Sequence, residues 1–448
     1  MGNREMKIAA ALVMTVMFVL AAQDAIAADD LTGDCRVGTY RLQDGTDVDI
    51  GPTDGPHFRW RRKDGTTGEL TEVSDGSWTS TLGWTERPDG KRVSFSDCAQ
   101  GEIRFDGVKG KRIAFDVTET KFQGAGVSLA GRLVMPKGNG RVPIVVLIHG
   151  SERDSGRDFY TLQRLFPTEG IGAFVYDKRG TGASAGRYTQ DYLLLANDAI
   201  AATREAKRLA GSRAGRIGYH GGSQGGWVAP LAAKIEPVDF VIVGFGLAVS
   251  PLEEDREAIA LDMTRHGYGA DVMAKAMEIA DATATILLSD FREGYERLDA
   301  IRARYGNEPW FKHVHGDITF ALLEMSQAQL RERGPELVWH VPAQYDPMPV
   351  LRNLDVPQLW ILGSDDTDAP SAETEQRLRA LAAEGKPIVT AVFPHADHGI
   401  YEYETKADGT RISTRNADGY FAMMRDFICI GRVGKHYGAS VIFRSGRD

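Results

Sequence analysis

A glycine-rich turn constrains the fold of this 448-residue chain more than any other segment. Residues 216–220 are predicted to form a strand, Gly221-Gly222-Ser223-Gln224-Gly225-Gly226 follows directly, and a helix is predicted over residues 227–234. A G-x-S-x-G pattern between a strand and a helix makes a sharp turn that projects the serine hydroxyl above the sheet. The pattern therefore predicts that Ser223 is a nucleophile. A purely structural glycine turn is the alternative, because the chain contains 50 glycines.

Further segments have the composition of buried parallel strands. The run Pro143–Gly150 is apolar on both faces, as is typical of strands that helices cover on both sides. Similar runs alternate with helical stretches; they lie at residues 172–177, 216–220, 240–244, 358–363 and 388–393. This alternation predicts an α/β fold with a doubly wound, mostly parallel sheet, whose reactive groups gather at the carboxyl ends of the strands.

Two segments interrupt this alternation. Residues 28–117 carry short alternating runs separated by Asp-Gly pairs, which predicts a small β-rich domain with hairpin turns at those pairs. The pairs are Asp44-Gly45, Asp54-Gly55, Asp64-Gly65, Asp75-Gly76, Asp89-Gly90 and Asp106-Gly107. Residues from about 250 to 345 form an insertion too long for one crossover helix. We expect it to be a helical cap over the site, within an α/β domain that extends over residues 118–448.

Trp60, Trp78 and Trp84 lie in the β-rich segment. Packing in a small core is the favoured role for these rings, and ligand binding is the alternative. If they bind a ligand, the β-rich domain could be a glycan-binding or wall-binding module that delivers the rest of the chain.

The amino terminus has the pattern of a secretory signal peptide over residues 1–27. Basic residues precede an apolar run at 8–20, and Ala25-Ile26-Ala27 is a suitable cleavage site. We expect export into a bacterial periplasm. A net charge of −9 without a basic stripe disfavours nucleic acid as a partner, and no later run is long and apolar enough to predict a membrane span. The oligomeric state is not predictable from these features.

The chain contains three cysteines, and the expected export would place them in an oxidising compartment. In an oxidising compartment, Cys35 and Cys98 are predicted to form a disulfide within the β-rich segment. Cys429 lies in an apolar run and is predicted to be a buried thiol.

A serine nucleophile needs a base and an orienting acid. After the strand at 358–363 comes Gly363-Ser364-Asp365-Asp366-Thr367-Asp368, where spacing favours Asp366 over Asp365 and Asp368. After the strand at 388–393 come two histidines, and His398 is favoured over His395 because the adjacent Gly399 allows a close approach to the serine. Metal binding by either histidine pair, His395 with His398 or His313 with His315, is disfavoured because no third ligand has suitable spacing.

Backbone N–H groups near the turn could stabilise an oxyanion. The Gln224 N–H is one candidate, and the Ser151 N–H, which follows the strand ending at His149-Gly150, is the second. His149, Gly150, Gly221 and Gly225 are expected to have structural roles beside the site. Asp177 and Arg179 lie in a glycine-rich loop whose spacing does not match a nucleotide-binding loop, and we expect them to form an ion pair that fixes it.

Together, five motifs resemble those of the α/β-hydrolase superfamily, in its bacterial exported esterase and serine-aminopeptidase-like branch. The motifs are His149-Gly150-Ser151, Tyr176-Asp177-Lys178-Arg179-Gly180-x-Gly182, Gly221-x-Ser223-Gln224-Gly225-Gly226, Gly363-x-x-Asp366 and Asp397-His398-Gly399. The resemblance covers residues from about 118 to the carboxyl end and implies a Ser223–His398–Asp366 triad and an acyl-enzyme mechanism without a cofactor. Carboxylic ester hydrolysis is the leading expectation for a small-molecule substrate. Peptide or amide hydrolysis, thioester hydrolysis and a noncatalytic binding role are the alternatives.

Overall fold

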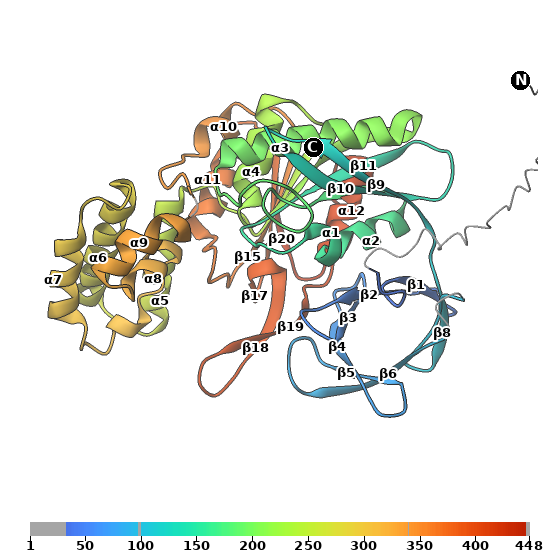
Figure 1. The fold of residues 1–448 in the computed structure, drawn as a ribbon, viewed down its shortest axis with the longest axis horizontal. Coiled ribbons are helices and arrows are strands. Elements are labelled where there is room, and N and C mark those ends of the chain that lie inside the picture. The colour runs from blue at the N-terminus through green and yellow to red at the C-terminus, as the bar shows by residue number, and fades with distance from the viewer. Residues whose placement is uncertain (1–32, 97–99, 339, 445–448) are drawn as a thin grey trace, which may run out of the picture.

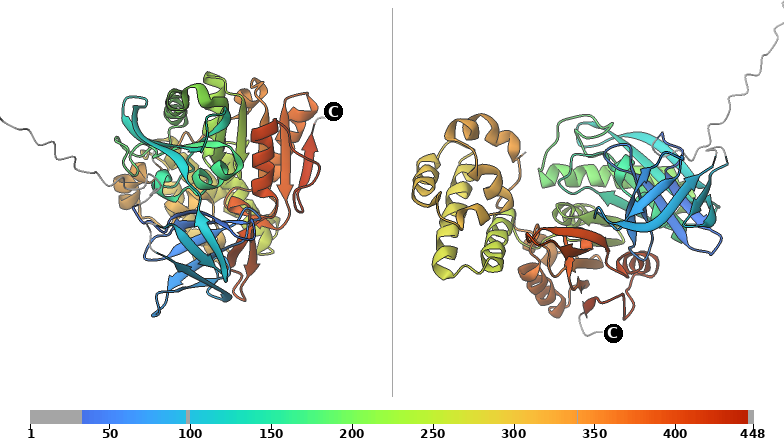
Figure 2. Two further views of the ribbon diagram at one scale, coloured as in Figure 1. Left: turned by 90° about the vertical axis from the view of Figure 1, so that its right-hand side faces the viewer. Right: turned by 90° about the horizontal axis from the view of Figure 1, so that it is seen from below.

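The computed structural model describes residues 33–96, 100–338 and 340–444. Within them the chain forms a small β barrel, an α/β domain and a lobe of helices, and Figures 1 and 2 show the barrel and the lobe at opposite ends of the α/β domain. The predicted signal peptide at residues 1–27 lies outside the described residues and stays a prediction. The same holds for the disulfide, because Cys98 is not described.

The amino-terminal barrel closes by pairing its first strand with its last, and every pairing around it is antiparallel. Its strands are β1 (Gly38–Leu42), β2 (Asp47–Pro52), β3 (Phe58–Arg61), β4 (Thr67–Glu72), β5 (Trp78–Thr81), β6 (Pro88–Phe95), β7 (Glu102–Phe105) and β8 (Val108–Arg112). The β-rich prediction is confirmed, but the expected hairpin at Asp89-Gly90 is wrong. The chain reverses earlier, where the Leu82 N–H bonds the Arg87 carbonyl, and Asp89-Gly90 lies inside β6 beside a shift in the β5–β6 register.

The tryptophans of the barrel pack against protein. Trp60 and Trp78 lie in the barrel core and are almost fully buried. Trp84 packs its ring against Tyr401 of the α/β domain, with 4.7 Å between ring centroids. Core packing is confirmed for the first two, which removes their rings from any exposed ligand-binding surface.

The α/β domain is built on a nine-stranded sheet in the order β20-β16-β15-β14-β13-β11-β12-β10-β9. Its strands are β9 (Phe115–Gln123), β10 (Ser128–Pro136), β11 (Val142–Ile148), β12 (Gly172–Tyr176), β13 (Ala214–Gly222), β14 (Phe240–Gly244), β15 (Gln358–Gly363), β16 (Ile388–Phe393) and β20 (Val441–Arg444). The six strands from β16 to β12 are parallel; β20 at one side of them, and β10 followed by β9 at the other, join through antiparallel pairings. The doubly wound, mostly parallel sheet is therefore confirmed.

Helices cover both faces of this sheet because successive strand residues alternate between two apolar cores. One core contains residues of α3 (Tyr192–Ala210), α4 (Gly225–Ile235), α10 (Met348–Arg352) and α11 (Ala372–Ala383). The other contains residues of α2 (Leu162–Leu165) and α12 (Tyr420–Ile430); the short α1 (Gly156–Phe159) precedes α2. Cys429 lies near the end of α12 on its exposed side, so the predicted burial of this thiol is wrong. The apolar run around it continues the helix beyond the part that packs on the sheet.

The insertion after β14 is a lobe of helices with its own apolar core. Its helices are α5 (Pro251–Arg265), α6 (Ala270–Leu288), α7 (Tyr295–Tyr305), α8 (Asp317–Leu323) and α9 (Gln327–Leu337). A capping box formed by Ser250 and Glu253 opens α5. The chain turns at Ser289–Gly294, between α6 and α7, and again at Glu324–Ser326, between α8 and α9.

A β ribbon after β16 joins the α/β domain to the barrel. It comprises β17 (Ala396–Asp397), β18 (Tyr401–Thr405) and β19 (Arg411–Asn416). The Asn416 N–H donates to the Gly65 carbonyl at 3.0 Å, and the Trp84 N–H donates to the Ser413 carbonyl at 2.9 Å. The barrel is thus bound to the ribbon through main-chain hydrogen bonds, and His398 lies within the ribbon, between β17 and β18.

Candidate active site

The turn between β13 and α4 holds Ser223 in a left-handed backbone conformation, with φ of 51°. A non-glycine residue adopts this conformation only where its surroundings hold it. Here the Ser223 N–H donates to the Gly244 carbonyl at 3.1 Å. A Cβ at Gly221 would lie 2.4 Å from the Gly225 carbonyl oxygen, so no larger residue fits at position 221 in this turn. The geometry is that of the elbow that the sequence predicts.

His398 and Asp366 are in direct contact. Nδ1 of His398 lies 3.0 Å from Oδ2 and 3.2 Å from Oδ1 of Asp366, and the aspartate is almost fully buried. The Asp366 carboxylate also accepts the N–H groups of Ala369 at 2.8 Å and Asp368 at 3.1 Å. These bonds fix the carboxylate, which in turn orients the imidazole with Nε2 directed away from the acid.

Neighbouring charges shift the pKa of His398. Burial alone would lower the pKa of His398, but the hydrogen bond from the imidazole to Asp366 and the charges of Asp366, Asp368 and Asp317 raise this pKa above its ordinary value. Asp317 is the first residue of α8, so the helical lobe acts on the imidazole electrostatically. Burial raises the pKa of Asp317 itself to about 6.

The competing acid and base candidates lie elsewhere. Asp365 accepts the hydroxyl of Tyr403 at 2.6 Å, and Ser364 donates to it at 2.7 Å. The side chain of His395 is 91% exposed and lies 3.7 Å from the carboxylate of Asp365. Asp366 and His398 are the pair that the structure brings together; their catalytic roles stay predictions.

The loop after β11 lies against Ser223. A Cβ built on Gly150 would lie 3.4 Å from the Cβ of Ser223, so the Gly150-Ser151 backbone passes next to the serine. The buried His149 precedes it, with Nε2 in hydrogen-bond contact with the Tyr176 carbonyl. Gln224 stands one residue ahead of the first residue of α4. Both predicted oxyanion donors, the N–H groups of Ser151 and Gln224, therefore flank Ser223; their function stays a prediction.

Two charged residues that the sequence analysis did not assign support this loop. Glu152 accepts the Gly150 N–H at 3.1 Å and the Tyr160 hydroxyl. Burial alone would raise the pKa of Glu152, but His149 and Lys178 nearby lower it to about 2. Lys178 donates from Nζ to the Gly150 carbonyl at 2.7 Å. The position of Glu152 directly after Ser151 was the feature of the sequence that could have indicated its role beside this loop.

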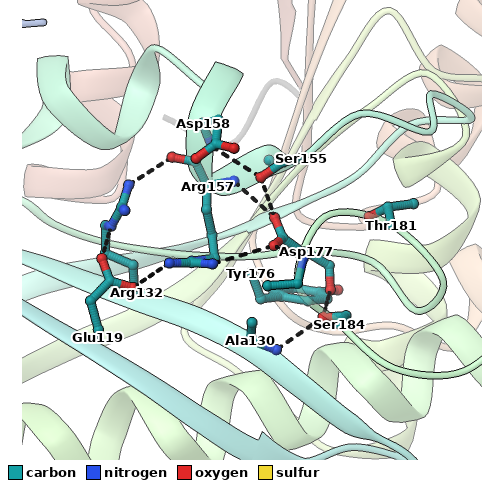
Figure 3. A network of polar contacts seen from close by, with 12 residues as sticks. Glu119, Ala130, Arg132, Ser155, Arg157, Asp158, Tyr176, Asp177, Thr181 and Ser184 are labelled. Carbon is teal, nitrogen blue, oxygen red and sulfur yellow. Dashed lines mark hydrogen bonds and ion pairs between the residues drawn. The ribbon is translucent and has the colours of Figure 1, made fainter. Parts of the chain in front are cut away.

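Asp177 organises the neighbouring loop, but not with the predicted partner. Its carboxylate accepts the Ser155 hydroxyl at 2.7 Å and the Ala183 N–H at 2.9 Å, and lies 3.5 Å from the Arg157 guanidinium (Figure 3). Arg179 instead pairs with Asp198 of α3, at 2.7 Å. The expected Asp177–Arg179 ion pair is wrong because the loop folds back over Asp177, while the side chain of Arg179 extends to α3.

A cavity of about 560 Å³ contains Ser223 and His398 in its wall. Glu152, Ser151 and Gly150 line it as well. The rest of the described lining comes from the barrel, from α1, α2 and α12, from the ribbon, and from the carboxyl ends of β11, β13 and β14. No residue of the helical lobe is among them, so the expectation that the lobe covers the site is wrong for this cavity. Trp310 of the lobe packs in the lobe's own core.

Within the described ranges, no group of three or more His, Cys, Asp and Glu side chains is placed to hold a metal ion. In the same residues, no helix has both the length and the apolarity that a membrane crossing requires.

Comparisons with known proteins agree with this architecture. The model of a family described as the alpha/beta hydrolase family matches residues 145–408. No curated protein sequence matches the chain.

Solved structures found to be similar to the chain share little sequence with it. An esterase of Pyrococcus furiosus is 15% identical with a TM-score of 0.40, over 64% of this chain and 83% of the esterase. An acylaminoacyl peptidase of Pyrococcus horikoshii is 16% identical with a TM-score of 0.44, over 88% of this chain and 57% of the peptidase. An esterase of Thermogutta terrifontis is 18% identical with a TM-score of 0.36, over 63% of this chain and 91% of the esterase.

Proposed function

The chain belongs to the alpha/beta hydrolase family, and from this premise we propose that it is a serine hydrolase that cleaves carboxylic esters of small molecules through an acyl-enzyme intermediate. The observation that carries the proposal is the contact of 3.0 Å between His398 and the buried Asp366, in a site whose cavity also contains Ser223. An imidazole oriented in this way is the base that a serine hydroxyl needs.

The proposed reaction follows from these positions. Nε2 of His398 accepts the Ser223 proton as the oxygen attacks the ester carbonyl, and Asp366 stabilises the resulting imidazolium. The N–H groups of Gln224 and Ser151 donate to the oxyanion of the tetrahedral intermediate. The imidazolium then returns the proton to the leaving alkoxide, and a water molecule, activated by the same imidazole, releases the acid from Ser223.

Labelling with a fluorophosphonate probe tests the nucleophile. The wild-type protein should react through Ser223, and Ser223→Ala should lose labelling together with about 10⁴-fold or more of its turnover. Ser74→Ala is a matched control, because Ser74 is an exposed serine on the barrel. An active wild type that resists the probe, or equal labelling of Ser223→Ala, would exclude the serine mechanism, and an inactive protein would favour the binding role.

Ester preference is tested separately. Rates on matched acyl esters, aminoacyl amides and thioesters should rank the oxygen esters first, since hydrolysis of an amide requires protonation of a poorer leaving group. Faster cleavage of the amides or of the thioesters would assign the protein to those classes instead. Export into the periplasm, also a proposal, is tested by fractionating cells that express the full chain.

A further inference from the structure

The barrel contributes a basic wall to the cavity that contains Ser223. Arg61, Arg62 and Lys63, at the end of β3, line it together with Gly65. This wall lies beside the loop that carries His398. The Gly65 carbonyl accepts the Asn416 N–H, and the Asn416 side chain donates to the Gly399 carbonyl at 3.0 Å.

Two of the three basic groups have identifiable neighbours in the protein. Lys63 lies 2.7 Å from Asp47 and also pairs with Glu169. The Arg62 guanidinium lies over the Phe105 ring, 5.2 Å from its centroid. These contacts account for the positions of both side chains.

Arg61 differs from two arginines that lie near it, Arg59 and Arg164. We find no hydrogen bond or ion pair from its guanidinium to any described residue. The nearby Arg59 pairs with Glu69 at 3.1 Å, and Arg164 pairs with Asp49 at 2.7 Å. Each of those two cations thus has a carboxylate of its own, whereas the half-buried Arg61 has none.

Arg61 lies near groups of both signs. Burial lowers the pKa of Arg61, the charges of Tyr401 and Asp49 oppose this shift in part, and the positive charge of Arg164 adds to it with a smaller effect. Burial, and then the charge of Arg61, lower the pKa of Arg59 to about 10. A buried cation is costly without a counter-charge in direct contact, so an anion beside Arg61 would supply the ion-pair partner that the described residues do not.

We propose that Arg61 binds a carboxylate of the substrate, so that the esters cleaved at Ser223 carry a second, anionic group. A single guanidinium matches one carboxylate through two parallel hydrogen bonds. Apolar side chains of the same cavity, including Leu162, Phe421 and Met424, would hold the hydrocarbon part of the molecule. This inference rests on the proposed esterase function and specifies its substrate class.

Two pairs of synthetic esters test the inference, each with a carboxylate and a neutral carboxamide of the same size. The anion lies in the acyl part for the mono-4-nitrophenyl ester of adipic acid, whose partner is the corresponding 5-carbamoylpentanoate. It lies in the leaving group for 3-carboxyphenyl butanoate, whose partner is 3-carbamoylphenyl butanoate. In at least one pair, kcat/KM of the wild type should favour the carboxylate by roughly ten- to hundredfold, the range for a hydrogen bond between charged groups.

Arg61→Gln should remove this preference by slowing the carboxylate ester alone, and Arg61→Lys should restore part of it. Arg104→Gln is the matched control, because Arg104 is an exposed arginine of the same barrel that donates to the Gly107 carbonyl and does not line this cavity. Fluorophosphonate labelling of each variant at the wild-type rate shows that Ser223 and its surroundings are intact.

The outcomes separate this inference from the function on which it rests. A wild type that cleaves esters through Ser223 but favours neither carboxylate overturns the role of Arg61 and leaves the serine esterase standing. A preference that survives in Arg61→Gln also overturns it. A wild type that neither cleaves the esters nor reacts with the probe overturns the proposed function, and the inference with it.

Discussion

Removing the carboxylate of Asp49 should destabilise the contact between the barrel and the α/β domain far more than its small size suggests. Asp49 of β2 and Arg164 of α2 are both fully buried, and they form two parallel hydrogen bonds of 2.7 and 2.9 Å. The Thr39 hydroxyl donates to the same carboxylate at 3.1 Å. In Asp49→Ala, three donors lose their acceptor and a guanidinium remains buried without a counter-charge.

The expected loss is about 3–5 kcal/mol in the free energy of unfolding, the usual cost of removing one partner of a buried ion pair. Most of this cost is the penalty for the unpaired cation. Replacing both residues, in Asp49→Leu with Arg164→Met, should therefore restore much of the loss, because apolar side chains of similar volume need no partner there.

Urea denaturation measured by tryptophan fluorescence provides the comparison, with the free energy extrapolated to water for each variant. Arg87→Ala is the control. Arg87 and Glu404 also pair between the barrel and the α/β domain, but Arg87 is 61% exposed. An exposed pair of this kind contributes about 0–1 kcal/mol.

Equal losses in Asp49→Ala and Arg87→Ala would refute the reasoning, because burial would then not distinguish the two pairs. A double variant as unstable as Asp49→Ala would also refute it, since the unpaired cation could not be the cause.

Two further predictions concern the site. The raised pKa of His398 should place the acid limb of the kcat/KM profile above the ordinary histidine value of about 6.5, because the imidazole must be neutral to accept a proton. Asp317→Asn removes a negative charge near the imidazole and should move that limb to lower pH. An unmoved limb would contradict the influence of α8 on His398. Gly65→Ala should lower both ester turnover and the melting temperature, because its Cβ would lie 2.1 Å from the Asn416 carbonyl oxygen. Gly45→Ala, with a similar positive φ and open space around it, should change them less; equal effects would mean that backbone strain alone is responsible.

The parts of this molecule that depend on neighbouring residues in the chain were predictable. The strand, turn and helix around Ser223 are set by small residues and local periodicity, and Ser250 caps α5 through residues three positions away. The edge of the sheet where Asp366 and His398 meet follows from parallel strands ending together.

The partners of individual charged groups were not predictable in the same way. Arg179 pairs with Asp198 because α3 packs beside its loop, and Asp177 accepts N–H groups of the loop that folds over it. Sequence spacing contains no information on which of several carboxylates a side chain reaches once the helices have packed.

The largest difference between the expectation from the sequence and the structure concerns which part of the chain forms the walls of the site. The length of the insertion made the helical lobe the expected cover, but the barrel supplies the basic wall of the cavity. The Gly65 carbonyl accepts the Asn416 N–H, and the Asn416 side chain donates to the carbonyl of Gly399, the residue after His398. A movement of the barrel would therefore displace both a wall of the cavity and the loop that carries the imidazole. For this reason we expect the barrel to affect substrate selection and turnover together, which an independent delivery module would not do.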